Sequence, residues 1–384
     1  MQQRVSIVEP LARSFPPSCI GAGAARTLRH RRLLVLALNT LTVTALAAAM
    51  AVVLGYGGWS PARVGMLIAF VVTLPWLSIG FWNAIIGTIV AARGGDPLTA
   101  LPDTPGVPIA GRTAIVMAVR NEDPERSILR LRGIFEDLEA SGAADHFDVH
   151  VLSDTDDPAV AAREAALVAA WQAASARPSQ IFYRRRTDNS GYKAGNLEEF
   201  CRRCRDAYDF FLPLDADSFL SAANVLRLVR TMERQPTIGI LQTLAVGTPS
   251  TQFFTRVFQF GMRHGMRAYT TGATWWAGDC GPYWGHNALI RMAPFAESCS
   301  LPVLPGRGPL GGHVMSHDQV EAVLMRRAGY EVRVIVEEGE SWEENPPTLP
   351  DFIRRELRWC QGNMQYFQLL GLGGLKPMSR VQLA

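Results

Sequence analysis

Asp215 and Asp217 are the residues of this sequence that most clearly suggest chemistry. One residue separates the two carboxylates, and the apolar run Phe210–Leu214 comes directly before them. If that run is a strand, its side chains alternate between two faces, so both aspartates leave it on the same face. Paired carboxylates at a strand's carboxyl end suit a hard divalent cation such as Mg²⁺, and open α/β sheets bind ligands there. We therefore expect a metal-bound sugar-nucleotide diphosphate; the alternative is an acidic turn.

Two other charged residues stand next to predicted strands or helices. Asp154 follows the alternating run 147–152 and could accept hydrogen bonds from a nucleobase or a ribose. Lys193 opens a predicted helix and could bind a phosphate, with Gly195 permitting close approach. The alternatives are a solvent-exposed strand end for Asp154 and an ordinary solvated lysine for Lys193.

Asp318 is the candidate general base. Ser316 and Gln319 have the spacing of a capping box, so we expect a helix to begin there and to run to about Ala328. In the first turn of that helix, the helix dipole stabilises the Asp318 carboxylate. An ionised, positioned carboxylate is what a general base requires, although aspartate is also common in first turns without any catalytic role.

The aromatic segment 275–287 is a candidate carbohydrate surface. It is dense in tryptophan and glycine, and its Trp284 and His286 could contact an acceptor sugar. The same composition equally suits a packed core turn, in which His286 satisfies a buried backbone group. Both interpretations remain open at this point.

Arg355, Arg358 and Trp359 form a second candidate surface. They lie at i, i+3 and i+4 of a helix expected to begin after Thr348, so they share one face. That face offers guanidinium groups for a diphosphate and an indole for a sugar. A solvated basic face is the usual alternative.

A glycine pattern further along the chain does not fit this chemistry. Gly306, Gly308 and Gly311 match the dinucleotide-binding fingerprint, and Glu331 follows about 20 residues later. Prolines interrupt the preceding segment 301–305, so no strand leads into the glycines. We therefore reject a nicotinamide-dependent dehydrogenase and expect a mobile loop.

Composition limits the remaining classes. A chain of 384 residues is long enough for about two domains, and its net charge of +3 is too small to indicate a nucleic-acid partner. The six cysteines show no disulfide framework. Cys201 and Cys204 have no second pair at zinc-site spacing, so reduced thiols in a cytosolic domain are the simpler account.

Two long apolar runs near the N-terminus predict a membrane hairpin. Arginines flank its outer ends, so by the positive-inside tendency both ends lie in the cytoplasm. A buried helical hairpin of a soluble protein is the alternative. The expected order is a basic flexible tail at 1–32, two transmembrane helices at about 33–55 and 64–91 within residues 33–92, a linker at 93–111, a catalytic domain at 112–364 and an interfacial segment at 365–384.

Strand and helix patterns alternate from residue 113 onward. This alternation predicts parallel βαβ units and a Rossmann-like, doubly wound, mostly parallel α/β sheet. Strands are expected at 113–119, 147–152, 181–184, 210–214, 238–243 and 330–337, and helices at 124–141, 158–174, 194–208, 224–234, 251–269, 316–328 and after 348.

The order and spacing of these motifs resemble a known family. Asp154, Asp215-Ala216-Asp217, Asp318 and Arg355-x-x-Arg358-Trp359 are similar to the D, D-x-D, D, Q-x-x-R-W pattern of membrane-bound family 2 glycosyltransferases, such as cellulose synthase and hyaluronan synthase. Arg355 stands where the wider family has Gln. The segments Arg-Asn-Glu-Asp-Pro, Tyr-Lys-Ala-Gly-Asn and Trp-Gly-His-Asn-Ala more closely resemble the glucosyltransferases of osmoregulated periplasmic glucan synthesis, over about residues 30–384.

This resemblance implies a GT-A fold and inverting transfer from UDP-glucose to a growing β-glucan, with Mg²⁺ or Mn²⁺ as cofactor. It implies a cytoplasmic catalytic domain at the bacterial inner membrane, in contact with membrane lipid. A periplasmic glucan-processing protein and acyl carrier protein are partners implied by the resemblance alone. By the same resemblance, Asp154 binds uridine, Asp215 and Asp217 bind diphosphate and metal, Asp318 deprotonates the acceptor, Arg358 neutralises the leaving diphosphate and Trp359 stacks on the acceptor sugar.

Family members carry further membrane helices after the Arg-Trp motif, so we expect this chain to be the first half of a longer synthase. Three rival functions stay open. Another processive synthase, or a glycosyltransferase with a lipid-phosphate acceptor, would share the donor chemistry but make a different product. A membrane-tethered UDP-sugar sensor would bind the nucleotide without turnover.

Overall fold

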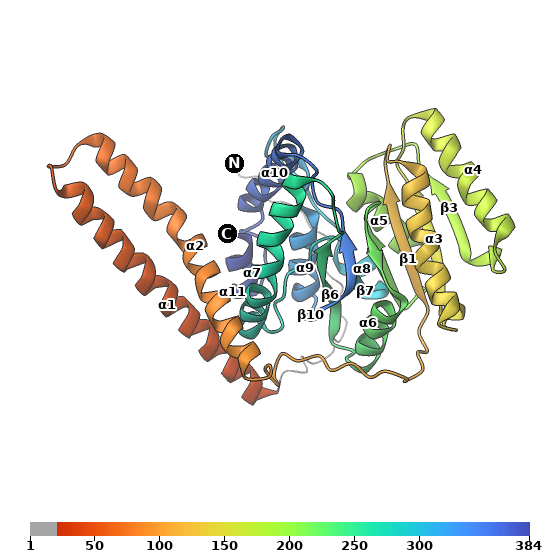
Figure 1. The fold of residues 1–384 in the computed structure, drawn as a ribbon, viewed down its shortest axis with the longest axis horizontal. Coiled ribbons are helices and arrows are strands. Elements are labelled where there is room, and N and C mark those ends of the chain that lie inside the picture. The colour runs from red at the N-terminus through yellow and green to blue at the C-terminus, as the bar shows by residue number, and fades with distance from the viewer. Residues whose placement is uncertain (1–20) are drawn as a thin grey trace. The chain divides into compact units, whose positions relative to one another are not determined.

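The computed structural model describes residues 21–384, so residues 1–20 of the predicted basic tail lie outside the described part. The described residues form two compact units. One unit combines residues 101–259 with 279–384, and the other combines residues 21–100 with residues 260–278. Figure 1 shows the course of the chain through both.

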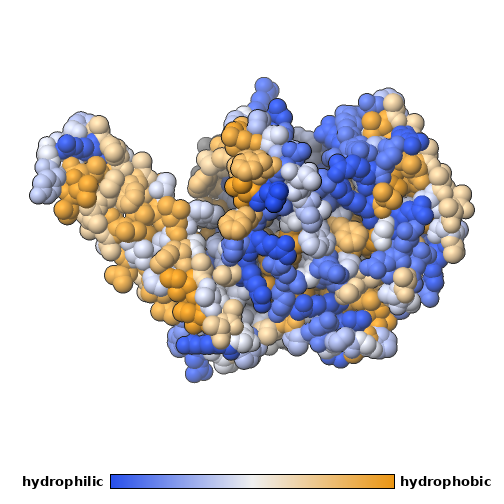
Figure 2. All heavy atoms as spheres, viewed as in Figure 1, coloured by the Kyte–Doolittle hydropathy of each residue, from blue (hydrophilic) through white to orange (hydrophobic). Residues whose placement is uncertain are grey.

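The smaller unit contains two long apolar helices, α1 (Ala22–Gly55) and α2 (Pro61–Ala92). Both are long and apolar enough to cross a membrane, and only 6% and 11% of their most apolar windows are buried. Figure 2 shows apolar side chains along both helices. A core helix of a soluble protein would bury most of this surface. The two helices include the predicted spans 33–55 and 64–91.

The C-terminal part of helix α7 (Phe253–Ala277) packs against α2 within the same unit. Glycine permits the contact, because a Cβ atom on Gly87 would lie 1.7 Å from the Ala268 carbonyl oxygen. Next to it, Trp276 Nε1 donates a 2.8 Å hydrogen bond to Asn83 Oδ1.

The larger unit is built on an eight-stranded sheet with the order β3-β2-β1-β4-β7-β6-β10-β5. Strands β1 to β4 pair in parallel, as do β6 and β10, which confirms the predicted mostly parallel α/β sheet. The sequence predicts neither β5 nor β7, and both run antiparallel to their neighbours. The strands are β1 (Thr113–Val119), β2 (Phe147–Ser153), β3 (Ile181–Arg185), β4 (Phe210–Leu214), β5 (Phe219–Leu220), β6 (Ile238–Gly247), β7 (Ala288–Arg291) and β10 (Glu331–Glu343).

Two of the helices begin with the same Asp-Pro pair. Asp123 and Asp157 accept hydrogen bonds from backbone N–H groups of the first turns of α3 and α4, and the following proline occupies the first helical position. The predicted helix 194–208 ends earlier, at Arg203, and the predicted helix 251–269 continues to Ala277. The remaining helices are α3 (Pro124–Ala140), α4 (Pro158–Ala174), α5 (Tyr192–Arg203), α6 (Ala222–Arg234), α8 (Met292–Ser298), α9 (His317–Arg327), α10 (Leu349–Met364) and α11 (Pro377–Leu383), with short 3-10 turns η1 (Ala144–His146), η2 (Pro178–Gln180) and η3 (Gln365–Gln368).

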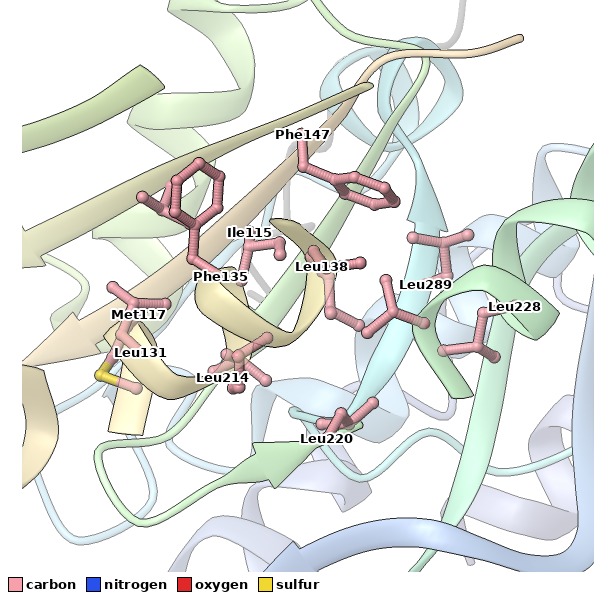
Figure 3. Close-up of a cluster of buried hydrophobic side chains, with 14 of the residues drawn as sticks. Ile115, Met117, Leu131, Phe135, Leu138, Phe147, Leu214, Leu220, Leu228 and Leu289 are labelled. Carbon is pink, nitrogen blue, oxygen red and sulfur yellow. The ribbon is translucent and has the colours of Figure 1, made fainter. Parts of the chain in front are cut away.

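Each face of the sheet carries its own apolar core. On one face, Leu131, Phe135 and Leu138 of α3 pack against the strands, as Figure 3 shows around Ile115 and Met117. Each such fully buried side chain stabilises the fold by about 1.5–3 kcal/mol. On the other face lie buried residues of α5, α8 and α9, and the segment after α10 adds Leu369, Leu372, Leu375 and Leu383 to that core.

This topology brings the carboxyl ends of the parallel strands to one edge of the sheet. Because β7 runs the other way, the residues before it reach the same edge. The segment between α8 and α9, expected to be a mobile loop, contains a short antiparallel pair, β8 (Val303–Leu304) and β9 (Gly312–His313), and leads directly into α9.

Candidate active site

Asp215 is paired with Lys193 just beyond the end of β4. Lys193 lies in the first turn of α5, and its Nζ donates to Asp215 Oδ1 and, over 2.9 Å, to the Gly285 carbonyl oxygen. Burial raises the pKa of Asp215, but the positive charges of Lys193 and His286 outweigh it and lower the pKa to about 2. Asp215 is therefore an ionised carboxylate with one oxygen bound to a lysine.

Gly195 shapes the turn that carries Lys193. A Cβ atom at this position would lie 2.2 Å from the Ser190 carbonyl oxygen. The N-cap residue Gly191 has a φ of 72°, a left-handed conformation that glycine adopts without strain. The close approach expected at Gly195 is thus made by the chain's own backbone, and it fixes the start of α5.

Asp217 stands in a region of excess negative charge. Its pKa is raised first by burial and then by the Asp215 carboxylate. The pKa of Glu122, which follows β1, is likewise raised by burial and then by Asp217 and Asp215, while Arg358 acts in the opposite direction. Within residues 21–384 the Asp217 carboxylate makes no ion pair. A bound cation would relieve this repulsion.

His286 lies beside the same carboxylates. Its Nε2 is 3.2 Å from Glu343 Oε2, and its Nδ1 is 3.4 Å from Ser218 Oγ. Burial lowers the pKa of His286, but Asp215 and the hydrogen bond with Glu343 raise it to about 9. His286 is therefore a cation at neutral pH. Trp284, two residues earlier, is half-buried, and its backbone N–H donates to Gln242 Oε1 over 2.9 Å.

Asp318 lies in the first turn of α9, as predicted, but the predicted capping box is wrong. Ser316 is the N-cap residue, yet its side chain makes no cap hydrogen bond. A Cβ atom on Gly285 would lie 3.5 Å from Asp318 Cβ, so Asp318 packs against the residue whose carbonyl accepts from Lys193. The neighbouring His317 Nδ1 is 2.9 Å from the buried Glu321 Oε2.

Asp154 is buried at the end of β2, and Arg186 engages both of its carboxylate oxygens. Arg186 Nη2 lies 2.9 Å from Asp154 Oδ2, and Arg186 Nε donates to Oδ1. The same Nη2 donates over 2.7 Å to the carbonyl oxygen of Tyr192, the residue before Lys193. Asp154 thus joins the site through an arginine that follows β3.

The two arginines of α10 have different surroundings. The Arg355 guanidinium lies 4.3 Å from the centre of the Trp359 ring and near two phenylalanine rings, so it covers one face of the indole. Arg358 is exposed, and its charge acts on Glu122. Of the guanidinium pair expected to meet a diphosphate, Arg358 acts on Glu122, whereas Arg355 pairs with Glu356 on its own helix. Trp359 is 46% exposed.

Comparison with known proteins shows what this chain is similar to. Residues 210–381 match the family described as "Glycosyl transferase family group 2". The chain is 42% identical over 347 residues to "Glucans biosynthesis glucosyltransferase H" of Xanthomonas campestris pv. campestris (strain B100), covering 90% of this chain and 54% of that protein. The same-named protein of Bradyrhizobium diazoefficiens is 38% identical over 388 residues, covering 97% and 52%. This chain is a family 2 glycosyltransferase homologue. It spans about half the length of the curated relatives it matches.

Among solved structures, this chain is similar to the mannosyltransferase PcManGT from Pyrobaculum calidifontis, which was determined in complex with GDP-Man and Mn²⁺. The TM-score is 0.53 at 16% identity, covering 80% of this chain and 77% of that chain. At this identity the likeness concerns the fold alone, and it confirms the GT-A-like architecture.

Asp215 and Asp217 fit a cation that takes only some of its ligands from the protein. Among residues 21–384 no three His, Cys, Asp or Glu side chains are grouped closely enough to hold a metal ion by themselves. In the described part of the chain Asp217 provides a carboxylate that makes no ion pair, and Lys193 engages Oδ1 of Asp215. Such a donor set suits a cation that takes its other ligands from a diphosphate.

Several residues of this edge are not predicted from the sequence. Glu122, Arg186 and Glu343 follow or end β1, β3 and β10, and Glu321 lies one turn beyond His317. For Glu122 and Arg186 a signal exists, because both come directly after predicted parallel strands, as Asp154 does. Glu343 has no such signal, since the strand was expected to end six residues earlier.

Proposed function

We propose that the chain forms the catalytic part of an inverting glucosyltransferase. It would transfer glucose from UDP-glucose to the growing β-glucan backbone of osmoregulated periplasmic glucans. One observation carries this proposal: the Asp215–Lys193 pair and Asp318 both meet Gly285, and the Asp215 carboxylate also acts on the charge of Asp217. The identity with curated glucan glucosyltransferases supports the choice of sugar.

The proposed reaction is a single displacement at the anomeric carbon. The acceptor hydroxyl oxygen forms the new bond to that carbon while the bond to the diphosphate oxygen breaks and UDP departs. The hydroxyl proton passes to the Asp318 carboxylate in the first turn of α9. Displacement from the opposite side inverts the configuration of the sugar.

The donor is held by residues on both sides of β4. Lys193 and Arg358 supply positive charge for the diphosphate, and Asp154 with Arg186 lies where a uridine would meet the ends of β2 and β3. When bound, a Mg²⁺ or Mn²⁺ ion at Asp217 and Asp215 would neutralise charge on the departing UDP. His286 adds a fixed positive charge behind these carboxylates and is assigned to the donor side rather than to the acceptor.

The acceptor sugar is assigned to the indole face of Trp359 that Arg355 leaves open, with Trp284 as the second aromatic residue. Helices α1 and α2 would anchor the catalytic part to the bacterial inner membrane, with the active site on the cytoplasmic side. The proposal also includes two partners of the whole protein, a periplasmic glucan-processing protein and acyl carrier protein.

Membranes that contain the full-length protein provide the test. They are incubated with labelled UDP-glucose and Mg²⁺, and the linkages of the product are determined. A β-linked glucan that requires the cation is the expected result. If the product is a lipid-phosphate-linked glucose or a polymer other than a glucan, the acceptor is not the growing β-glucan. Tight UDP-glucose binding without any transfer would show that the protein is a sensor.

A further inference from the structure

The glycine-bearing segment before α9 is held by α10 and η3. Gln365 makes two of these contacts: its Oε1 accepts from the Met315 N–H over 2.9 Å, and its Nε2 donates to the His313 carbonyl oxygen over 3.1 Å. The Tyr366 hydroxyl donates to the Ser316 carbonyl oxygen over 3.0 Å. Gln365 is 1% exposed and Tyr366 7%. Three backbone groups directly before α9 are therefore fixed by two buried side chains.

Further contacts hold the tip of the same segment. Gln361 donates to the Pro309 carbonyl oxygen over 3.1 Å, and Gln368 donates to that of Leu310 over 2.9 Å. The two segments also approach closely at Gly362, where a Cβ atom would lie 2.2 Å from Ser316 Oγ and 2.6 Å from the Ser316 nitrogen. We call Gln361, Gln365, Tyr366 and Gln368 the α10–η3 clasp.

The clasp takes the place of the N-cap side-chain hydrogen bond that α9 lacks. Most helices fix their first turn with an N-cap side chain. Ser316 makes no such bond, so the position of the first turn of α9 is set by the backbone that leads into it. Asp318 lies in that turn. The clasp also follows Arg358 and Trp359 directly along the chain, so one continuous helical segment holds both groups.

We propose that Gln365 and Tyr366 are positioning residues for Asp318, holding it in register with the Arg358–Trp359 turn of α10. This inference rests on the proposed function, because it needs Asp318 to act as the base. The clasp touches neither the Lys193–Asp215 pair nor Asp217, so it acts on the alignment of the base and not on donor binding. A misplacement of about 1 Å at a reacting group lowers the rate by up to about 100-fold.

The test uses the full-length protein in membranes and compares Gln365→Ala and Tyr366→Phe with Gln180→Ala. Gln180 is a matched control, because its side chain also makes two hydrogen bonds to backbone groups. Its Nε2 donates to the carbonyl oxygens of Ala144 and Phe147, at 2.8 and 2.7 Å, at the β2–β3 end of the sheet. We expect Gln365→Ala to lower kcat by about 10–100-fold and Tyr366→Phe by about 3–10-fold. UDP-glucose KM should stay within about twofold for both, and the control should be unaffected.

A double-mutant cycle separates positioning from general damage. If Gln365 acts through Asp318, then Gln365→Ala causes almost no further loss in an Asp318→Asn background. Additive losses, a raised UDP-glucose KM or a normal kcat would each overturn the inference, and Tyr366→Phe keeps it testable if Gln365→Ala does not fold. An Asp318→Asn protein with full activity would instead refute the proposed base, and this inference with it.

Discussion

Two histidines of the larger unit differ in charge: His286 is a cation at neutral pH and His150 is neutral. His286 lies at what we call the donor edge, defined by Lys193, Asp215, Asp217, His286 and Glu343, where its pKa is raised to about 9. His150 lies within β2, where burial and the nearby Arg184 lower its pKa to about 3. Both side chains are largely removed from water, so burial alone does not decide their charge.

The neighbours explain the difference. The ring of His150 stacks on Phe182 with centroids 4.6 Å apart, and its Nε2 lies 2.9 Å from the Tyr208 hydroxyl. That hydroxyl donates to Asp148 over 2.7 Å, so its oxygen accepts from a neutral His150. These residues, called the β2 cluster, satisfy each other without net repulsion. At the donor edge, by contrast, burial and the neighbouring Asp215 carboxylate raise the pKa of Asp217, which is the pattern expected of a functional site.

The largest effect is expected for Asp318→Asn, which removes the proposed base and leaves the donor edge intact. We expect kcat for glucosyl transfer to fall by about 10²–10⁴-fold, because proton removal from the acceptor is lost. UDP binding, measured by calorimetry, should be unchanged. Glu125→Gln, which changes the first-turn acid of α3, is the control and should retain activity. Equal turnover in the two variants would remove Asp318 from the mechanism.

Asp217→Asn tests whether the excess negative charge serves a cation. We expect activity to fall by about 10²–10³-fold, with a higher Mg²⁺ concentration needed for half-maximal rate, since electrostatic stabilisation of the leaving group is lost. Asp148→Asn in the β2 cluster is the control, because it makes the same substitution at a buried aspartate outside the donor edge. If both variants lose activity to the same extent, the negative charge of the donor edge has no special role in binding a cation.

The sequence predicts the donor edge better than the β2 cluster. Asp215 and Asp217 are found because an apolar run ends abruptly in carboxylates, and Asp154 because it follows an alternating run. β7 is missed because only four residues between an aromatic turn and α8 form it, too few for a period to show. The end of β10 at Glu343 is missed because three register shifts interrupt its pairing with β6. The β2 cluster depends on contacts between residues about 60 positions apart, which no local pattern shows.

His286→Asn is expected to have a smaller effect on rate and a clear effect on pH dependence. Loss of the positive charge beside Asp215 should lower activity by about tenfold. Because the folded-state pKa of about 9 lies above the ordinary value of 6.5, the stabilisation by protonated His286 is complete below pH 6.5. It is lost as the pH rises through about 9. Thermal unfolding of the detergent-solubilised protein between pH 6 and 10 should therefore show an alkaline decline that the variant lacks, and an unchanged decline would contradict the assignment.

His150→Phe should have the smallest effect on activity and change the opposite end of the pH range. The folded-state pKa of about 3 lies below 6.5, so the unfolded chain binds a proton that the folded chain does not as the pH falls from 6.5 towards 3. Stability is lost over that window. Phenylalanine keeps the stack on Phe182 and cannot be protonated, so the variant should resist acid better than the wild type. The cost is one hydrogen bond to Tyr208, about 1 kcal/mol at neutral pH. An acid decline that persists unchanged would mean that His150 is already protonated in the folded chain, and the two histidines would no longer differ in charge.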